Sequence, residues 1–335
     1  MSERANERPG DKIASWINAR QEKAELNDVE QYRFSIIIPT YERPRQLVAC
    51  LDSLKGLDYP RDLFEVIVVD DGSKVPLKDV VAPFHDELNL TLLTQENAGP
   101  ALARNAGAME AKGAFLAFTD DDCTPAPTWL NKIALRLAET PDHMIGGRVI
   151  NALPDNIFTA SNQLMTDAVY SYYNDDSRRP HFFASNNLIV PADRFRALGG
   201  FDATFPLAAS EDREFCERWL QHGYLMTYVP EAIVGHAHAL TFRNFLRHHF
   251  NYGRGARHFH SVRARRGWQR LTIDPKFYLH FFSYPFSHVY GTQTFSFEAL
   301  FMLSYVAYTG GFFWEKVNGA MVDRGSSSDS SEALQ

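Results

Sequence analysis

The chain contains a short apolar run that ends in three consecutive aspartates. The run, residues 114–119, reads Ala-Phe-Leu-Ala-Phe-Thr and is followed at once by Asp120, Asp121 and Asp122. Its length suits a buried strand, but burying ionised carboxylates costs several kcal/mol each without a compensating cation. We therefore expect the aspartates at the carboxyl end of a strand, in a ligand-binding cleft. Oxygen ligands there suit Mg²⁺ or Mn²⁺ shared with substrate phosphates. The alternative is an acidic loop or helix cap.

A second apolar run ends in the same way. Residues 64–69 read Phe-Glu-Val-Ile-Val-Val and are followed by Asp70 and Asp71. Because parallel strands end at the same edge of a sheet, both acidic clusters are expected to face one cleft. Two more strands and three helices alternate with these runs, which predicts an α/β fold with a doubly wound, mostly parallel sheet. The further strands are predicted over residues 34–39 and 88–93, and the helices over residues 46–54, 97–111 and 129–138.

The chain lacks the patterns of several common site types. It has no G-x-G-x-x-G after a strand and no G-x-x-x-x-G-K-[ST], which disfavours dinucleotide dehydrogenases and P-loop enzymes. Cys50, Cys123 and Cys216 lie far apart, which excludes a cysteine-based zinc site and a disulfide framework and fits a reducing cytosol. The net charge of −7 argues against a general nucleic-acid binder. The charged N-terminal segment predicts no signal peptide.

The pattern is less regular after residue 140. Residues 146–150 and 183–190 are predicted strands, and residues 154–182 form a loop or helix over the cleft. A helix is predicted next, with Glu211 and Asp212 in its first turn. Acidic residues in a first turn stabilise a helix and need no further purpose. When two carboxylates are neighbours, the repulsion between their charges also raises the pKa of one of them.

Taken together, these stretches resemble an inverting family 2 glycosyltransferase with the GT-A fold. The resemblance covers roughly residues 33–240. Each motif is weak by itself, whereas their order and spacing together are specific. The matching stretches are Ile38-Pro39-Thr40-Tyr41, Val68-Val69-Asp70-Asp71-Gly72-Ser73, Asn97-Ala98-Gly99 with Ala103-Arg104-Asn105, Asp120-Asp121-Asp122, and Glu211-Asp212.

The resemblance implies a nucleotide-sugar site at the ends of the strands. Asp71 is expected to accept a hydrogen bond from a base N–H, and Arg104 to contact the donor. Glu42 departs from the pattern, because family members often carry Asn at this position. The residues expected to contact the nucleotide-sugar are Pro39, Thr40, Tyr41, Glu42, Asp71, Gly99, Arg104, Asp120 and Asp121.

The resemblance also implies the catalytic groups. Asp122, the last residue of a DxD-type motif, is expected to ligate the metal ion. Asp212 is expected to be the general base that takes the proton of the acceptor hydroxyl, with Glu211 beside it. Adjacent helical residues diverge by about 100°, so only one can point squarely into the cleft, and we choose Asp212. The amides of Asn186 and Asn187 are expected to contact the acceptor.

Two histidines follow the predicted sites. In a strand His236 and His238 would share one face, which is a common metal-ligand geometry. A late histidine completes the metal shell in some GT-A enzymes, so the resemblance makes His236 a candidate ligand. The alternative is a pair of histidines satisfied by neighbouring groups, and which of the two would ligate the metal stays open.

The segment from residue 241 is basic and aromatic within an acidic chain. Base stacking on nucleic acid is conceivable, but no RNA-binding motif is present. Binding to anionic lipid headgroups is the better account, and a solvated basic face is the alternative. The arginines are Arg243, Arg247, Arg254, Arg257, Arg263, Arg265, Arg266 and Arg270.

Two apolar stretches follow the basic segment. Residues 277–297 carry no Asp, Glu, Lys or Arg, and residues 299–314 are more apolar. Neither provides the about 20 predominantly apolar residues of a spanning helix, so interfacial or re-entrant helices, or a face for self-association, are expected. The predicted organisation begins with a polar, helical extension over 1–32 and a GT-A domain over 33–240. A basic, aromatic, membrane-associated helical region over 241–323 and a Ser-rich disordered tail over 324–335 follow.

The sequence therefore predicts a cytoplasmic enzyme, peripheral on the inner face of the cell membrane. It would move a sugar from a nucleoside-diphosphate sugar, with UDP-sugars favoured, to a hydroxyl of a sugar or lipid-linked acceptor in cell-surface polysaccharide or glycolipid synthesis. A metal-dependent nucleotidyltransferase is one alternative, but residues 39–44 offer no glycine-rich loop. An inactive nucleotide-sugar-binding membrane scaffold is another, disfavoured by the complete acidic set.

Overall fold

The fold is taken from a computed structural model of the chain. It describes residues 32–174, 180–205, 207–268 and 274–332, with side chains up to residue 318. The predicted N-terminal extension over residues 1–32 lies outside the described residues except for Tyr32.

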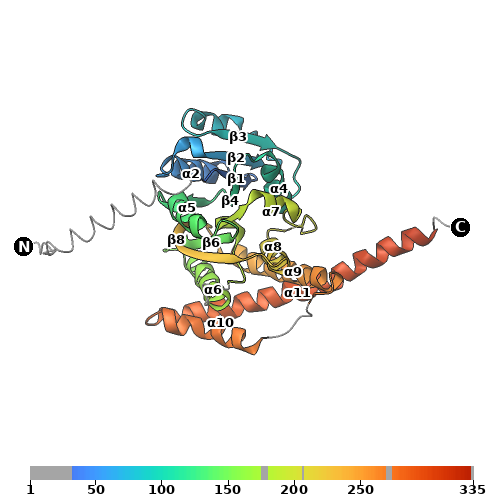
Figure 1. Cartoon of the computed structure of the whole chain (residues 1–335). Coiled ribbons are helices and arrows are strands. Elements are labelled where there is room, and N and C mark those ends of the chain that lie inside the picture. Colours follow the sequence, from blue (N-terminus) through green and yellow to red (C-terminus); the bar gives the residue numbers. More distant parts are fainter. Residues whose placement is uncertain (1–31, 175–179, 206, 269–273, 333–335) are drawn as a thin grey trace, which may run out of the picture.

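A mixed sheet of eight strands lies at the centre of the described chain (Figure 1). Its strands are β1 (Phe34–Thr40), β2 (Phe64–Asp70), β3 (Leu90–Thr94), β4 (Phe115–Phe118), β5 (Cys123–Pro125), β6 (Met144–Asn151), β7 (Leu188–Pro191) and β8 (Met226–His236). The spatial order is β3-β2-β1-β4-β7-β6-β8-β5. The first four strands in this order run parallel. Three of them, β1, β2 and β4, are buried throughout, as expected for parallel strands covered on both faces.

Helices cover both faces of the sheet, which confirms the expected doubly wound α/β architecture. One face carries Ile36 and Ile38 of β1 and packs against α2 (Pro44–Lys55) and α5 (Trp129–Glu139). The other face carries Ile37. The helices that pack on this second face are α4 (Pro100–Glu110), α7 (Ala192–Ala197) and α8 (Glu211–Gln221).

The strands β1, β2 and β4 end together at one edge of the sheet. Thr40 at the end of β1 pairs with Asp70 at the end of β2. The amide of Thr119, just after β4, donates a hydrogen bond to the Ile37 carbonyl of β1. The two aspartate clusters thus follow the two neighbours of β1, and the prediction that they share one edge is confirmed.

The sheet as a whole is rich in parallel pairs, as predicted, because β6 and β8 also run parallel. The rest of this half is antiparallel. β7 runs antiparallel to both β4 and β6, and β5 runs antiparallel to β8. β5 was not predicted, because a strand of three residues has little pattern of its own and forms against β8. The predicted strand over 183–190 begins instead as the 3₁₀ turn Ser185–Asn187 before β7. Helix α6 (Ile157–Tyr173) lies within residues 154–182, the segment predicted to form a loop or helix over the cleft.

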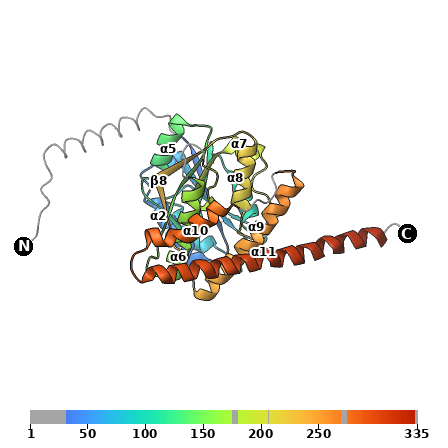
Figure 2. The same ribbon diagram turned by 90° about the horizontal axis from the view of Figure 1, so that it is seen from below.

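Three helices follow the sheet and lie in the lower part of Figure 1, and Figure 2 shows the molecule from that side. They are α9 (Phe242–Arg265), α10 (Pro275–His288) and α11 (Gln293–Glu332). Backbones of α9 and α11 touch at two glycines. A Cβ atom on Gly311 would meet the Phe250 carbonyl oxygen at 1.8 Å, and one on Gly253 would meet the Tyr308 carbonyl oxygen at 1.8 Å. Glycine is therefore required at both positions.

The C-terminal region differs from its prediction in two respects. Arg254, Arg263 and Arg266 form ion pairs inside the protein, so they add less free positive charge than their number suggests. Helix α11 continues to Glu332 and overlaps the 324–335 tail that the sequence predicts to be disordered. None of the helices in the described part of the chain combines the length and the hydrophobicity that crossing a membrane requires.

Candidate active site

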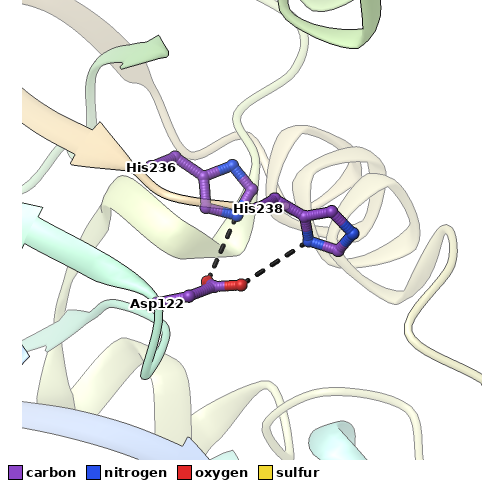
Figure 3. Close-up of side chains that lie close together, drawn as sticks. All are labelled: Asp122, His236 and His238. Atoms are coloured by element: carbon purple, nitrogen blue, oxygen red, sulfur yellow. Dashed lines mark ion pairs between the residues drawn. The ribbon is translucent and has the colours of Figure 1, made fainter. Parts of the chain in front are cut away.

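A carboxylate and two imidazoles converge where β4, β5 and β8 meet (Figure 3). His236 Nε2 lies 3.2 Å from Asp122 Oδ1, and His238 Nδ1 lies 3.5 Å from Asp122 Oδ2. The pairing of β5 with β8 sets this arrangement, because it places Cys123 opposite His236. His236 ends β8 and His238 lies two residues beyond it, so the prediction that both lie on one strand holds only for His236.

These three side chains fit a divalent metal ion. Their ligand atoms all lie within 4.8 Å of one another. Burial by itself would raise the pKa of Asp122, but hydrogen bonds with His236 and His238 hold that pKa well below its usual range. The donor set is one carboxylate with two imidazoles, and it contains both predicted metal ligands, Asp122 and His236, with His238 in addition. Carboxylates suit Mg²⁺ and Mn²⁺ whereas imidazoles suit later transition metals, so this mixed set suits a divalent ion that accepts both oxygen and nitrogen ligands.

Arg43 supplies the positive charge that the aspartates require. Its Nη1 lies 3.1 Å from Asp122 Oδ2 and 3.2 Å from Asp121 Oδ1. Thr40 donates a second hydrogen bond to Asp121, at 2.7 Å. Burial raises the pKa of Asp121 to about 6, although Arg43 opposes the rise. Sequence reasoning missed Arg43, although its position directly after the first strand was a usable signal.

Arg104 joins the aspartate cluster to the start of α8. Its two terminal nitrogens lie 2.8 Å from Asp120 and 3.0 Å from Glu211. Arg104 and Glu211 are both buried. Burial by itself would lower the pKa of Arg104, but the charges of Asp120 and Glu211 have a larger, opposite effect and raise it. The guanidinium therefore stays charged. That Arg104 contacts the donor stays a prediction. In the structure Arg104 connects Asp120 to Glu211.

Glu211 and Asp212 differ in environment despite being neighbours. Glu211 is buried against Arg104, whereas Asp212 is half-buried and its Oδ1 accepts a hydrogen bond from the Arg213 amide at 2.7 Å. Burial and the Asp212 charge raise the pKa of Glu211 to about 7. Burial also raises the pKa of Asp212. Asp212 has no salt bridge in the described chain, so it is the freer of the two to accept a proton.

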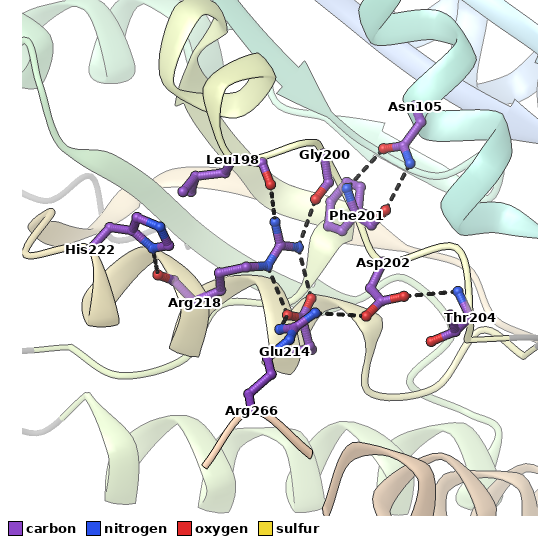
Figure 4. A network of polar contacts seen from close by, with 10 residues as sticks. All are labelled: Asn105, Leu198, Gly200, Phe201, Asp202, Thr204, Glu214, Arg218, His222 and Arg266. Carbon is purple, nitrogen blue, oxygen red and sulfur yellow. Dashed lines mark hydrogen bonds and ion pairs between the residues drawn. The ribbon is translucent and has the colours of Figure 1, made fainter. Parts of the chain in front are cut away.

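A network of polar contacts anchors α8 behind these carboxylates (Figure 4). Glu214 and Arg218 pair within the helix at 2.8 Å, and Arg266 at the end of α9 also bonds Glu214. Arg218 donates to the carbonyl oxygens of Leu198 and Gly200. Because these groups are satisfied by one another, the network holds the first turn of α8 without using Glu211 or Asp212.

The backbone before α8 is strained. Ser210 has a φ angle of 72°, in the left-handed region that non-glycine residues rarely adopt. Among the described residues outside glycine, only Glu42 shares this feature, with a φ angle of 57°. Such conformations cluster at functional sites, and these two lie just before Asp212 and just after β1.

The predicted nucleotide contacts lie around the ends of β1 and β2. Asp71 accepts hydrogen bonds from the amides of Ala98 and Gly99, each at 2.9 Å, and so holds the loop before α4. Gly99 has a φ angle of 92°, which explains the glycine there. Glu42 accepts a hydrogen bond from the Lys74 amide and thereby joins the loops after β1 and β2. Pro39 and Thr40 are buried in β1 and Tyr41 is exposed.

The two predicted acceptor contacts occupy different surroundings. Asn187 is fully buried and its amide bonds Trp129, the Arg148 carbonyl and the Ala232 carbonyl. These bonds assign Asn187 a structural position between strands. The Asn186 Oδ1 atom is buried and has no hydrogen-bond partner in the described part of the chain. Asn186 is therefore the one of the pair with a free acceptor atom.

Helix α9 lies against the site, although the sequence predicted a site complete within residues 33–240. Gly255 of α9 packs on the segment before Ser210, since a Cβ there would meet the Ala209 carbonyl oxygen at 2.4 Å. The charges of Asp212 and Glu211 contribute to the raised pKa of Tyr252, whose main cause is burial. The C-terminal region thus borders the candidate base.

Comparisons with known proteins identify chains that are similar to this one. The family model described as glycosyl transferase family 2 matches residues 35–196. Glycosyltransferase AglE of Haloferax volcanii is 30% identical over 224 residues, which are 66% of this chain and 72% of that protein. The pre-mycofactocin glycosyltransferase of Mycobacterium tuberculosis is 27% identical over 227 residues, which are 66% of this chain and 46% of that protein. The chain thus spans less than half the length of the mycobacterial relative.

A solved structure shares the fold over nearly its whole length. The mannosyltransferase PcManGT from Pyrobaculum calidifontis, in complex with GDP-Man and Mn²⁺, has a TM-score of 0.62 and 18% sequence identity. The match covers 90% of this chain and 95% of that one. This likeness concerns the fold, and it supports the GT-A architecture that the sequence resemblance predicted.

Proposed function

Because the chain belongs to glycosyl transferase family 2, we propose that it transfers a sugar with inversion from a nucleoside-diphosphate sugar to a hydroxyl acceptor. One observation carries this proposal. Arg104 pairs with Asp120 of the aspartate cluster and with Glu211, the neighbour of Asp212, and so brings the carboxylates proposed for the donor and acceptor sides close together. A nucleotidyltransferase has no comparable support.

The proposed chemistry uses the two sides of this cleft. Asp212 accepts the proton of the acceptor hydroxyl as its oxygen bonds the anomeric carbon. The bond from that carbon to the diphosphate oxygen breaks on the opposite face, and the nucleoside diphosphate leaves. A divalent cation held by Asp122, His236 and His238 would supply charge stabilisation for the diphosphate. Arg43 lies beside these ligands and adds positive charge at the same place.

The donor side is proposed for the ends of β1 and β2. Tyr41 is exposed there and can stack on a base, while Asp71 keeps part of its Oδ2 acceptor capacity beside the Gly99 amide. UDP-sugars are the favoured donors, and GDP-sugars belong in the same test because the solved mannosyltransferase binds GDP-Man. The acceptor is proposed to be a sugar or a lipid-linked hydroxyl, with Asn186 as a contact.

We also propose that α10 and α11 rest on an anionic membrane surface. Exposed apolar side chains recur along α11 at intervals of seven and four residues, which places them on one helical face. They are Phe295, Met302, Val306, Phe313 and Val317. Lys276 and Lys316 on these helices are matched in number by Glu298 and Glu315, so the exposed apolar face carries this proposal. This arrangement suits a helix lying in the interface plane, on the cytoplasmic leaflet.

A donor screen tests the proposed activity. Thermal shifts would be measured with UDP-, GDP- and dTDP-sugars, with and without Mn²⁺, followed by an assay of nucleoside diphosphate release. We expect one donor to stabilise the protein in the presence of the metal and to be turned over. Absence of any donor-dependent shift and of any release would remove the proposal.

A further inference from the structure

A cavity of about 350 Å³ opens beside Asp122 and is walled on one side by α9. The α9 residues that line it are Asn244, Arg247, His248 and Asn251. Their spacing of three, four and seven residues from the first places them on one helical face. Each of these side chains carries at least one N–H donor. A helix outside the predicted catalytic region therefore presents a row of donors next to the candidate metal ligands.

The cavity carries more positive than negative charge. Arg43 faces it from the start of α2 and Arg247 from α9. Asp122 is the only carboxylate among the described residues of its wall, and it is already engaged by Arg43, His236 and His238. A divalent ion bound to Asp122 would increase the excess of positive charge in the cavity. The cavity is therefore complementary to an anion.

Arg247 is available for such an anion. No carboxylate partner of Arg247 exists in the described ranges, and its hydrogen bond goes to Asn244 Oδ1 in its own helix, at 3.0 Å. Other arginines of this region, such as Arg254 and Arg266, are neutralised by Glu315 and by Asp202. An unpaired guanidinium at a cavity wall is free to bind a planar or tetrahedral oxyanion through two N–H groups.

His248 provides a second, independent indication. Its Nε2 atom is buried and has no hydrogen-bond partner among the residues that the structure describes. Buried polar atoms are nearly always satisfied, so an orphan atom in the wall of a polar cavity indicates a group that is bound there. The His248 ring packs against the Tyr252 ring in a tilted arrangement, with ring centres 4.2 Å apart.

We propose that this cavity binds a phosphate group and that Arg247 is its main anchor from α9. This inference rests on the proposed glycosyl transfer and deepens it, because it extends the substrate site onto the C-terminal helices. The phosphate has two chemical sources: the diphosphate of the donor, or a phosphate on the acceptor. Arg247 and His248 act on this group as substrate-positioning residues, while Asp212 remains the base.

Binding measurements with two probes distinguish these sources. Calorimetry would compare UDP with UMP, each with Mn²⁺, and n-octyl phosphate with UDP already bound, for the wild-type protein and Arg247→Gln. Arg243→Gln is the matched control, because Arg243 is an exposed arginine one turn earlier on α9 that does not line the cavity. A hydrogen-bonded charge of this kind is worth roughly 10–100-fold in affinity.

The expected result is a loss on that order for Arg247→Gln alone. If UDP weakens while UMP does not, the cavity holds the donor diphosphate. If only n-octyl phosphate weakens, it holds an acceptor phosphate. Equal affinities of Arg247→Gln and Arg243→Gln for every probe would overturn the proposal. Failure of the glycosyltransferase proposal is distinguishable, because the wild-type protein would then bind octyl phosphate in the absence of nucleotide but none of the UDP-, GDP- and dTDP-sugars of the donor screen.

Discussion

The guanidinium of Arg104 lies 3.0 Å from the carboxylate of Glu211, and both side chains are buried. The two residues belong to α4 and α8, which reach the site from different parts of the chain. Breaking a buried ion pair by removing one partner is strongly destabilising, because it leaves an uncompensated charge. Glu211 is thus committed to holding α8 in place, and Asp212 is left to act as the base.

Asp212→Asn is expected to lower turnover by roughly 10²–10⁴-fold, the usual contribution of a general base. The amide keeps the shape of the side chain but cannot take a proton from the acceptor. Nucleotide affinity should stay close to that of the wild-type protein, as measured by calorimetry with UDP and Mn²⁺. A matching loss of nucleotide affinity would assign Asp212 to donor binding instead.

The rate should depend on pH near neutrality. Burial and the Asp212 charge raise the pKa of Glu211 to about 7, and burial raises that of Asp212. The base must be ionised, so turnover should fall as the pH is lowered through the raised pKa of Asp212. Glu211→Gln removes the like charge and should move this fall to lower pH. A profile that stays flat from about pH 5 to about pH 8 would contradict the coupling of the pair.

Stability should follow the opposite trend over the same interval. The folded state holds a proton on Glu211 up to about pH 7, whereas the unfolded chain releases it near the ordinary value of 4.5. The folded form therefore binds more protons in this window, and the Glu211 contribution to the free energy of unfolding falls as the pH rises. Urea unfolding of wild type and Glu211→Gln at several pH values measures this difference.

His238→Ala and His236→Ala should each weaken Mn²⁺ binding by at least about tenfold. Each variant removes one of the three proposed ligands and leaves only Asp122 and one imidazole to bind the metal. Titration of Mn²⁺ followed by its paramagnetic resonance signal measures the affinity without any substrate. His85→Ala is the control, because His85 is exposed and distant in sequence from the cluster. Unchanged affinity in both histidine variants would exclude this metal site.

Adjacent glycines on α11 allow a test of the contact between α9 and α11. Gly311→Ala should destabilise the protein by about 1–3 kcal/mol, because the new Cβ would lie 1.8 Å from the Phe250 carbonyl oxygen. Gly310→Ala should stabilise it by about 0.5–1 kcal/mol, because its Cβ would lie 3.8 Å from the nearest atom and alanine favours a helix. Thermal unfolding of both variants should show shifts of opposite sign.

The apolar face of α11 should hold the protein on anionic liposomes. Replacing Phe295, Val306 and Phe313 together by Ser is expected to abolish co-sedimentation, because it removes the buried apolar area. Salt should weaken the wild-type interaction, since charges near a bilayer are screened within about 10 Å. A control that replaces Val75, Met109 and Leu225 by Ser changes equally exposed residues elsewhere. Equal pelleting of both variants would leave self-association as the better account of this face.

Local pattern was sufficient for the half of the sheet that carries the aspartates. β1, β2 and β4 are continuous apolar runs because both faces of a parallel strand are buried. The residue after such a run emerges at the edge of the sheet, so Asp71 and Asp120–Asp122 could be placed there from the sequence. The start of α8 could also be predicted, because acidic residues in a first helical turn are a local signal.

The partners of those residues were decided by tertiary structure. Arg43 reaches Asp122 from the loop after β1, and His238 reaches it because β5 pairs with β8. Arg247 of α9 lines the cavity beside them only because α9 lies across that edge. A strand or a helix can be predicted because apolar residues recur at a fixed interval along its own stretch of sequence. The distant segment that packs against such an element is chosen by the fit of their surfaces, which leaves no repeat in the local sequence. The charge partners of the site could therefore be identified only in the folded chain.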